Sequence, residues 1–204
     1  MILLVAPLAA LVAWELLKGK PMTPKILGPK TPTRADQRSY VDRLRPIALR
    51  VEREGGIAPD GTKVLPGIKA DLGVLESAHE SSWGLSQLAG APAYNIFGMT
   101  AELGTYWRTQ LRPYFEIITT EWDKAGKEYK TVRPFRAYAS WEASYLDWAR
   151  RIQKPDFAPV YAAAIRGDWP AFGAALDQVK YATDPKYGAK IVSMAQAAKA
   201  AGLV

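Results

Sequence analysis

The sequence predicts a mainly helical α+β domain that carries one small β-hairpin and follows an N-terminal apolar helix. Apolar residues recur at the spacings i, i+3, i+4 and i+7 in segments after residue 39, which is typical of amphipathic helices. Between residues 114 and 138, two extended runs flank a turn that contains a glycine, which indicates a hairpin. The 204 residues suffice for one domain of about 150 to 165 residues and an appendage.

The appendage begins with an apolar segment, residues 1–17, interrupted by Pro7 and Glu15. As a helix it would span about 25 Å, slightly less than the roughly 30 Å hydrocarbon core of a bilayer. We expect residues 1–20 to form a membrane anchor or, alternatively, a buried interaction helix. No basic residue precedes the segment and no convincing small-x-small cleavage site follows it, so it does not fit a standard secretory signal.

A linker and then a single domain are expected after this segment. Residues 21–38 are rich in Pro, Thr, Lys and Gly, with Pro21, Pro24, Pro29 and Pro32 spaced along them. Such a composition favours an extended, semi-rigid chain. The domain is then expected to occupy residues 39–204.

The elements of the domain follow from periodicity and turn residues. Gly55 and Gly56 end the first helix, and Gly126 supplies the positive φ of the hairpin turn. The hairpin pairs residues 114–121 with residues 128–138. The expected helices cover residues 40–51, 68–82, 140–152, 157–165, 169–176 and 185–201.

Charge and composition argue against several function classes. The net charge of +7 divides into +6 for residues 1–50 and +1 for residues 51–204, so the basicity belongs to the arm and not to the domain. We expect no nucleic-acid partner, and a basic stretch after an apolar segment fits anionic lipid headgroups at least as well. The chain has no cysteine, and His79 is its single histidine. This argues against zinc sites and histidine-dependent triads, and no metal or cofactor is expected.

Glu80 is the first candidate catalytic residue. It lies in Ala78-His79-Glu80-Ser81-Ser82-Trp83-Gly84, where a predicted helix runs into an aromatic residue and a glycine. An apolar ring beside a carboxyl group raises its pKa, as in the proton donors of glycosidases. Glu76, four residues earlier on the same helix face, competes for this role. For His79, packing is the preferred interpretation over electrostatic tuning of Glu80.

Four further blocks follow Glu80 in order. They are Tyr94-Asn95-Ile96-Phe97-Gly98-Met99, Ile118-Thr119-Thr120-Glu121-Trp122, Phe135-Arg136-Ala137-Tyr138 with Ser140, and Tyr181-Ala182-Thr183-Asp184-Pro185 with Tyr187. Together with the block around Glu80 they resemble glycoside hydrolase family 73, the endo-β-N-acetylglucosaminidases of bacterial walls, which include flagellar peptidoglycan hydrolases and many phage lysins. The resemblance covers roughly residues 40 to 204.

The resemblance implies a lysozyme-like, two-lobed fold with the hairpin in the smaller lobe over a groove. It implies three catalytic residues, Glu80, Glu121 and Tyr181. Glu80 would be the acid, and Glu121 would act as base on a water if the enzyme inverts. Alternatively, the substrate's own 2-acetamido group attacks while Tyr181 or a nearby polar group orients it. Both mechanisms stay open, because they differ in carboxylate separation and lobe closure.

Five residues are predicted to bind substrate: Trp83, Tyr94, Asn95, Phe97 and Tyr138. The aromatic residues offer stacking faces for sugar rings, but aromatic residues more often pack a core, and Asn95 would have a structural or a substrate-positioning role. Many relatives carry an acidic residue after the Tyr of the Phe-Arg-x-Tyr block, where this chain has Ala139.

The expected substrate is the glycan strand of peptidoglycan, with membrane contact through residues 1–17 as a further partner. The lysines that follow residue 17 would hold that flank in the cytoplasm, whereas a wall hydrolase acts outside. A phage origin resolves this conflict, so we expect a virion or membrane-associated protein that acts in the bacterial envelope. The alternatives are a muramidase or lytic transglycosylase of the same fold and a non-catalytic virion or wall-binding protein.

Overall fold

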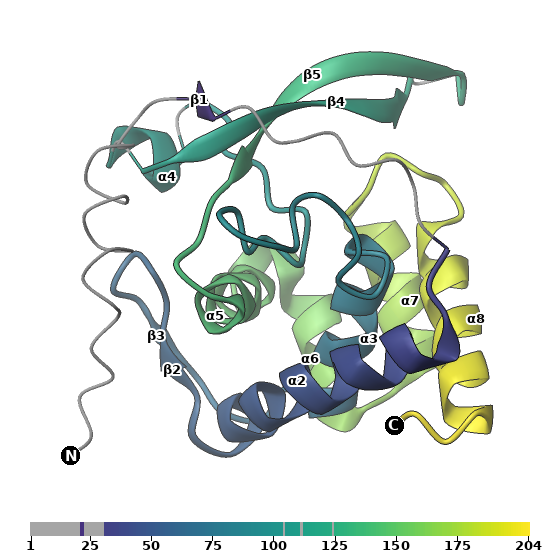
Figure 1. Cartoon of the computed structure of the whole chain (residues 1–204). Coiled ribbons are helices and arrows are strands. Elements are labelled where there is room, and N and C mark those ends of the chain that lie inside the picture. Colours follow the sequence, from purple (N-terminus) through teal and green to yellow (C-terminus); the bar gives the residue numbers. More distant parts are fainter. Residues whose placement is uncertain (1–20, 23–30, 104, 111, 124) are drawn as a thin grey trace.

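The computed structural model describes residues 21–22, 31–103, 105–110, 112–123 and 125–204. It contains a helical body with one long hairpin lying over one end of it (Figure 1). The predicted α+β class is therefore confirmed. The expected apolar helix of residues 1–17 lies outside the described residues. Within the described residues, no helix is both long and apolar enough to cross a membrane.

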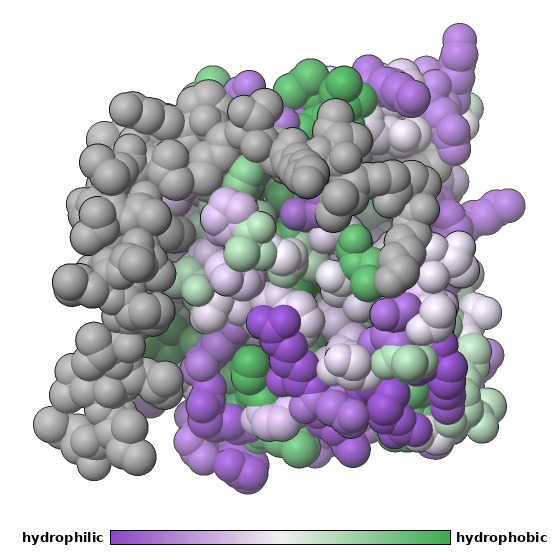
Figure 2. All heavy atoms as spheres, in the orientation of Figure 1, coloured by the Kyte–Doolittle hydropathy of each residue, from purple (hydrophilic) through white to green (hydrophobic). Residues whose placement is uncertain are grey.

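Helix α2, Arg34–Glu54, begins the domain. Thr33 caps it, since its side chain accepts a hydrogen bond from the backbone N–H of Asp36 while the Asp36 carboxylate accepts from the backbone N–H of Thr33. This capping box places the helix start four residues before the linker end expected at residue 38. The buried apolar side chains of α2 recur at the predicted helical spacing. The face of α2 that points outward is largely hydrophilic (Figure 2).

Helix α3, Ala70–Glu80, packs against α2 on one side and α8 on another (Figure 1). It follows two short antiparallel strands that the sequence did not predict, β2 (Gly56–Ile57) and β3 (Lys63–Val64). Most of the helix is buried, including the carboxyl group of Glu76. Its last residue is Glu80, so the helix ends where the chain turns out toward the hairpin.

The hairpin consists of β4, Tyr114–Trp122, and β5, Glu128–Arg136, in antiparallel register with Glu121 opposite Tyr129. Gly126 has φ +76° in the turn, as predicted. Strand β1, Pro21–Met22, adds to β4 in parallel. Because side chains alternate along a strand, the odd-numbered residues of β4 share one face with Glu121.

The remaining helices complete the body. They are α4 (Tyr106–Thr109), α5 (Trp141–Ile152), the 3-10 turn η1 (Pro155–Phe157), α6 (Ala158–Arg166), α7 (Trp169–Gln178) and α8 (Tyr187–Ala200). Helices α7 and α8 approach closely through Gly173 and Gly188: a Cβ at Gly188 would lie 2.1 Å from the Gly173 carbonyl oxygen. Apart from α4 and η1, these helices correspond to predicted ones.

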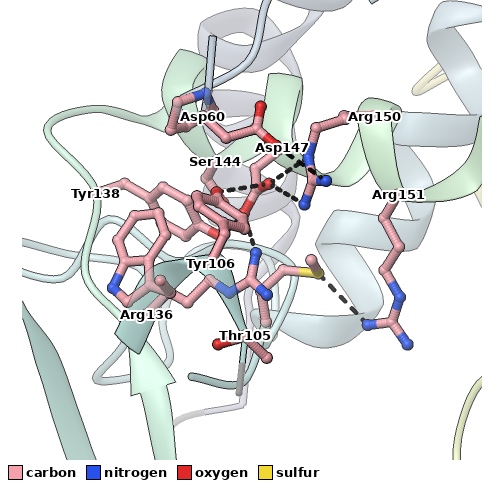
Figure 3. Close-up of polar contacts among 12 residues, drawn as sticks. Asp60, Thr105, Tyr106, Arg136, Tyr138, Ser144, Asp147, Arg150 and Arg151 are labelled. Carbon is pink, nitrogen blue, oxygen red and sulfur yellow. Dashed lines mark hydrogen bonds and ion pairs between the residues drawn. The ribbon is translucent and has the colours of Figure 1, made fainter. Parts of the chain in front are cut away.

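A buried polar cluster joins the base of the hairpin to α5 (Figure 3). Asp147 forms ion pairs with Arg136 of β5 and Arg150 of α5. Its carboxylate also accepts hydrogen bonds from the hydroxyls of Tyr138, at 2.7 Å, and Tyr106, at 2.9 Å. Arg151 follows Arg150 in α5 but points away from this cluster (Figure 3). Its Nη1 lies 3.6 Å from the Met99 sulfur. The cluster fixes the hairpin relative to the helical body.

Candidate active site

A cleft of about 710 Å³ separates the hairpin from the helical body. The end of α3, the loop between α7 and α8, the start of α8 and the strand β4 contribute to its lining. Glu80, Glu121 and Tyr181 all line it, although they are far apart in the sequence. The structure therefore brings the three predicted catalytic residues to one site.

Glu80 lies at the end of α3, with a partly exposed side chain. The Tyr187 hydroxyl donates a hydrogen bond to its Oε1. Its Oε2 lies only 3.1 Å from the place that a Cβ would take at Gly98, which has φ +57°. Burial raises the pKa of Glu80 to about 7, against the opposing effects of the Tyr187 hydrogen bond and the Arg151 charge. Glu80 can therefore carry a proton near neutral pH.

Glu121 faces the cleft from β4 and is held by two neighbours. Arg133 of β5 forms an ion pair with Oε1 at 2.9 Å, and the Thr183 hydroxyl donates to Oε2 at 2.7 Å. Arg133 also binds Glu102 at 2.6 Å. These contacts fix the Glu121 carboxylate across the cleft from α3.

Tyr181 lies in the loop between α7 and α8. Its ring stacks on that of Tyr187 at 5.6 Å, and the Arg151 guanidinium lies 4.7 Å from the ring centre. Burial, and then the charge of Glu76, raise the pKa of the Tyr181 hydroxyl well above its usual value. Tyr181 is therefore a neutral hydrogen-bonding group.

Of the five predicted substrate-binding residues, only Phe97 is among the cleft-lining residues. Trp83 packs edge-on against Tyr40, at 6.2 Å between ring centres, and Tyr94 packs against the core. Both have positive φ, +57° and +47°, in the turns that follow α3. Their rings serve the fold here, which agrees with the core-packing alternative.

Asn95 and Tyr138 are almost fully buried. The Asn95 amide donates to the carbonyls of Met99 and Arg136, both at 2.9 Å, so it ties its turn to β5. Tyr138 belongs to the Asp147 cluster. These contacts correspond to the structural role for Asn95, and they place Tyr138 away from the cleft.

Among the cleft-lining residues that were not predicted as site residues are Tyr187, Arg133 and Arg151. Tyr187 donates the hydrogen bond to Glu80. It was quoted with the block that begins at Tyr181, so the sequence could have indicated it as a site residue. Arg133 lies on the same face of the hairpin as Glu121. Once the strand register is known, the opposite charges of the two residues predict an ion pair between them. Arg151 gave no signal, because only the packing of α5 turns it toward the cleft.

His79 also lines the cleft, with its ring edge-on to Tyr187 at 5.6 Å. Burial, followed by the Lys190 charge, lowers the pKa of His79. The ring is therefore mainly neutral and packs beside the Glu80 contact. Within the described part of the chain, the cleft included, no group of three or more His, Cys, Asp or Glu residues is placed to hold a metal ion.

Comparison with known proteins gives consistent matches. The model of the glucosaminidase family, described as mannosyl-glycoprotein endo-β-N-acetylglucosaminidase, matches residues 65–200. The peptidoglycan hydrolase FlgJ of Salmonella typhimurium is 32% identical over 90% of this chain and 52% of its own length. A probable N-acetylmuramidase of Lactococcus lactis is 35% identical over 61% of this chain and 28% of its own length. The chain thus spans about half of these relatives or less.

Solved structures show the same fold. A peptidoglycan hydrolase mutant from Sphingomonas sp. A1 aligns with a TM-score of 0.64 and 28% identity, over 81% of this chain and 97% of that one. A C-terminally truncated glycoside hydrolase domain of Salmonella typhimurium FlgJ aligns with a TM-score of 0.55 and 30% identity, over 80% and 98%. With the family model matching more than half of its length, this chain belongs to the glucosaminidase family, glycoside hydrolase family 73.

Proposed function

We propose that this protein hydrolyses the β-1,4 glycosidic bond after N-acetylglucosamine in bacterial peptidoglycan. The observation that carries the proposal is the placement of two carboxyl groups, Glu80 and Glu121, in one cleft. Burial raises the pKa of Glu80 to about 7, which suits an acid. Cleavage of a glycosidic bond needs both an acid for the leaving oxygen and a group that stabilises or captures the sugar cation. Family membership and the names of the relatives support the same activity.

Glu80 would act as the general acid. Because Oε1 accepts the Tyr187 hydrogen bond, the transferable proton sits on Oε2, beside Gly98. A side chain at Gly98 would crowd this oxygen, so the glycine leaves room for the leaving oxygen of the substrate. Proton transfer from Oε2 then breaks the bond between the sugar carbon and that oxygen.

Glu121 would act on the opposite side of the scissile bond. Held by Arg133 and Thr183, its carboxylate is oriented to accept a proton from an attacking water or to stabilise positive charge on the sugar. The alternative mechanism, attack by the substrate's 2-acetamido group with help from Tyr181, uses the same cleft. Both mechanisms need Glu80.

A muramidase specificity is the second candidate, and one observation favours it: a relative of 35% identity is named a probable N-acetylmuramidase. A lytic transglycosylase would likewise use one acidic Glu and leave an anhydro end.

We further propose that the protein acts in the bacterial envelope, as the wall substrate requires. The virion or membrane association, the phage origin and the division into residues 1–20, 21–38 and 39–204 are hypotheses that rest on the sequence of the N-terminal arm. The relatives named above are bacterial proteins and give the phage origin no support.

Analysis of the sugar ends tests the specificity. Purified peptidoglycan is digested with the protein, reduced with borohydride and analysed by mass spectrometry. Reduced N-acetylglucosamine ends are the expected product. Reduced or anhydro muramic acid ends would assign the muramidase or transglycosylase specificity instead, and the absence of any product would overturn the enzymatic proposal in favour of a non-catalytic wall-binding or virion protein.

A further inference from the structure

A second carboxyl group lies one helical turn from Glu80, and the proposed mechanism does not use it. Glu76 and Glu80 are four residues apart and share one face of α3. The Glu76 side chain is 0% exposed, and its Oε2 has no hydrogen-bond partner among the described residues. A buried carboxyl group beside an active site needs a physical explanation, because burial of an unpaired charge costs several kcal/mol.

The hydrogen bonds of Glu76 decide where its proton lies. The indole N–H of Trp148 donates to Oε1 at 3.1 Å. Since an indole nitrogen only donates, Oε1 is the acceptor, and the proton of a neutral Glu76 sits on Oε2. Oε2 and the Tyr181 hydroxyl are both buried, and neither has a hydrogen bond of normal geometry within the described chain.

These two unsatisfied groups interact with each other. The Tyr181 hydroxyl is among the groups that shift the pKa of Glu76, and the charge of Glu76 raises the pKa of Tyr181. A buried acid that keeps its proton can donate it to the Tyr181 oxygen after a small rotation, which would satisfy both groups. Tyr181 would then keep its own proton for another acceptor.

Burial keeps Glu76 neutral at neutral pH. It raises the pKa of Glu76 to about 8, and the negative charge of Glu80 adds to the rise, whereas Tyr181, Trp148 and Arg151 oppose it. The titratable groups that face Glu76 come from four segments: Glu80 from α3, Tyr145 and Arg151 from α5, Tyr181 from the α7–α8 loop, and Tyr187 from α8.

We propose that Glu76 is a positioning residue for the acid of the site: as a neutral carboxylic acid it donates from Oε2 to the Tyr181 hydroxyl and fixes that ring. The Tyr181 ring stacks on Tyr187, and Tyr187 holds Glu80. Glu76 thereby orients Glu80 through two aromatic residues. This inference rests on the proposed function, because it assigns a role within the same site.

The neutral form is essential to this arrangement. An ionised Glu76 would accept a hydrogen bond from the Tyr181 hydroxyl, so that this hydroxyl could no longer donate to another acceptor. It would also place a negative charge one turn from Glu80 and oppose the ionised product form of the acid after proton transfer.

A double-mutant cycle between positions 76 and 181 tests the proposal on peptidoglycan. Glu76→Gln keeps both functions, since its amide oxygen accepts from Trp148 and its amide nitrogen donates to Tyr181. We expect this variant to lose less than about threefold in kcat, and Glu76→Leu to lose about tenfold or more with KM changed by less than about threefold. In a Tyr181→Phe background, Glu76→Leu should cost less than about twofold further, because nothing remains to be oriented.

Two results would overturn the proposal: equal losses in the Gln and Leu variants, or an undiminished loss from Glu76→Leu in the Tyr181→Phe background. The second pattern is what a purely structural role produces, since independent effects multiply.

Carboxyl-carbon NMR of the wild-type protein tests the same inference without relying on activity or on the folding of a variant. At about pH 6, Glu76 should show the shift of a carboxylic acid, and the Tyr181 ring signals should change as Glu76 titrates. A carboxylate shift for Glu76 at that pH, or Tyr181 signals that ignore its titration, would refute the positioning role. If the wild-type protein failed to cleave peptidoglycan, the proposed function would fall while this titration still reported on Glu76.

Discussion

At the scale of single residues, Glu80 has its acidity set by burial and by one neighbouring hydroxyl. Burial raises its pKa to about 7, and the Tyr187 hydrogen bond acts in the opposite direction. The acid must be protonated to work, so kcat/KM should fall as pH rises through about 7. An ordinary solvent-exposed Glu has a pKa of about 4.3, so a fall in activity near pH 7 would distinguish Glu80 from exposed carboxyl groups.

Replacing Tyr187 tests this balance. Tyr187→Phe removes the hydrogen bond that favours the ionised form, so the pKa of Glu80 should rise and the alkaline limb of the kcat/KM profile should move to higher pH. Turnover at the optimum should fall as well, because Glu80 loses its fixed orientation. The pH profile of peptidoglycan hydrolysis measures both effects, and a limb that stays in place or moves to lower pH would show that Tyr187 does not set the acidity of Glu80.

At the scale of elements, the Asp147 cluster holds the hairpin over the helical body. Arg136 comes from β5, Asp147 and Arg150 come from α5, and all three are buried. The Arg136 charge and the Tyr138 hydrogen bond hold the pKa of Asp147 below its usual range, although burial acts strongly in the opposite direction. The position of Glu121 relative to Glu80 depends on this junction, since the hairpin carries Glu121.

Removing the central charge should therefore destabilise the domain. Asp147→Asn leaves Arg136 buried without its partner, which typically costs about 3–5 kcal/mol. The pKa of Asp147 is lower in the folded state than in the unfolded state, where it is about 3.9. Asp147 therefore contributes to the free energy of unfolding above about pH 3.9, and this contribution is lost as the pH falls through the folded-state pKa. Denaturant unfolding at several pH values should show a large loss for Asp147→Asn at neutral pH and a smaller difference in acid. Asp42 of α2 is exposed, so Asp42→Asn is the matched control. Equal stability of the two variants would contradict the anchoring role of Asp147.

At the scale of the whole molecule, the sequence predicted the elements better than their contacts. The long helices and the hairpin followed from periodicity and from Gly126, whereas β2, β3 and α4 are two to four residues long and too short to show a period. The sequence blocks indicated Glu80, Glu121 and Tyr181. They could not show that Tyr138 turns toward Asp147, because that contact depends on how β5 meets α5.

The same limit applies to Glu76. Helical spacing places it beside Glu80, but its burial depends on Trp148 of α5 and on the Tyr181 loop, which only tertiary packing brings to α3.

The most direct test of the account is the turnover of Glu80→Gln on purified peptidoglycan. This variant keeps the shape of the side chain but removes the transferable proton, so we expect kcat to fall by about a thousandfold while the fold and wall binding are retained. Glu116→Gln, an exposed carboxyl group on the other face of β4, should retain wild-type turnover as the matched control. Turnover of Glu80→Gln within about threefold of wild type would contradict the assignment of Glu80 as the catalytic acid.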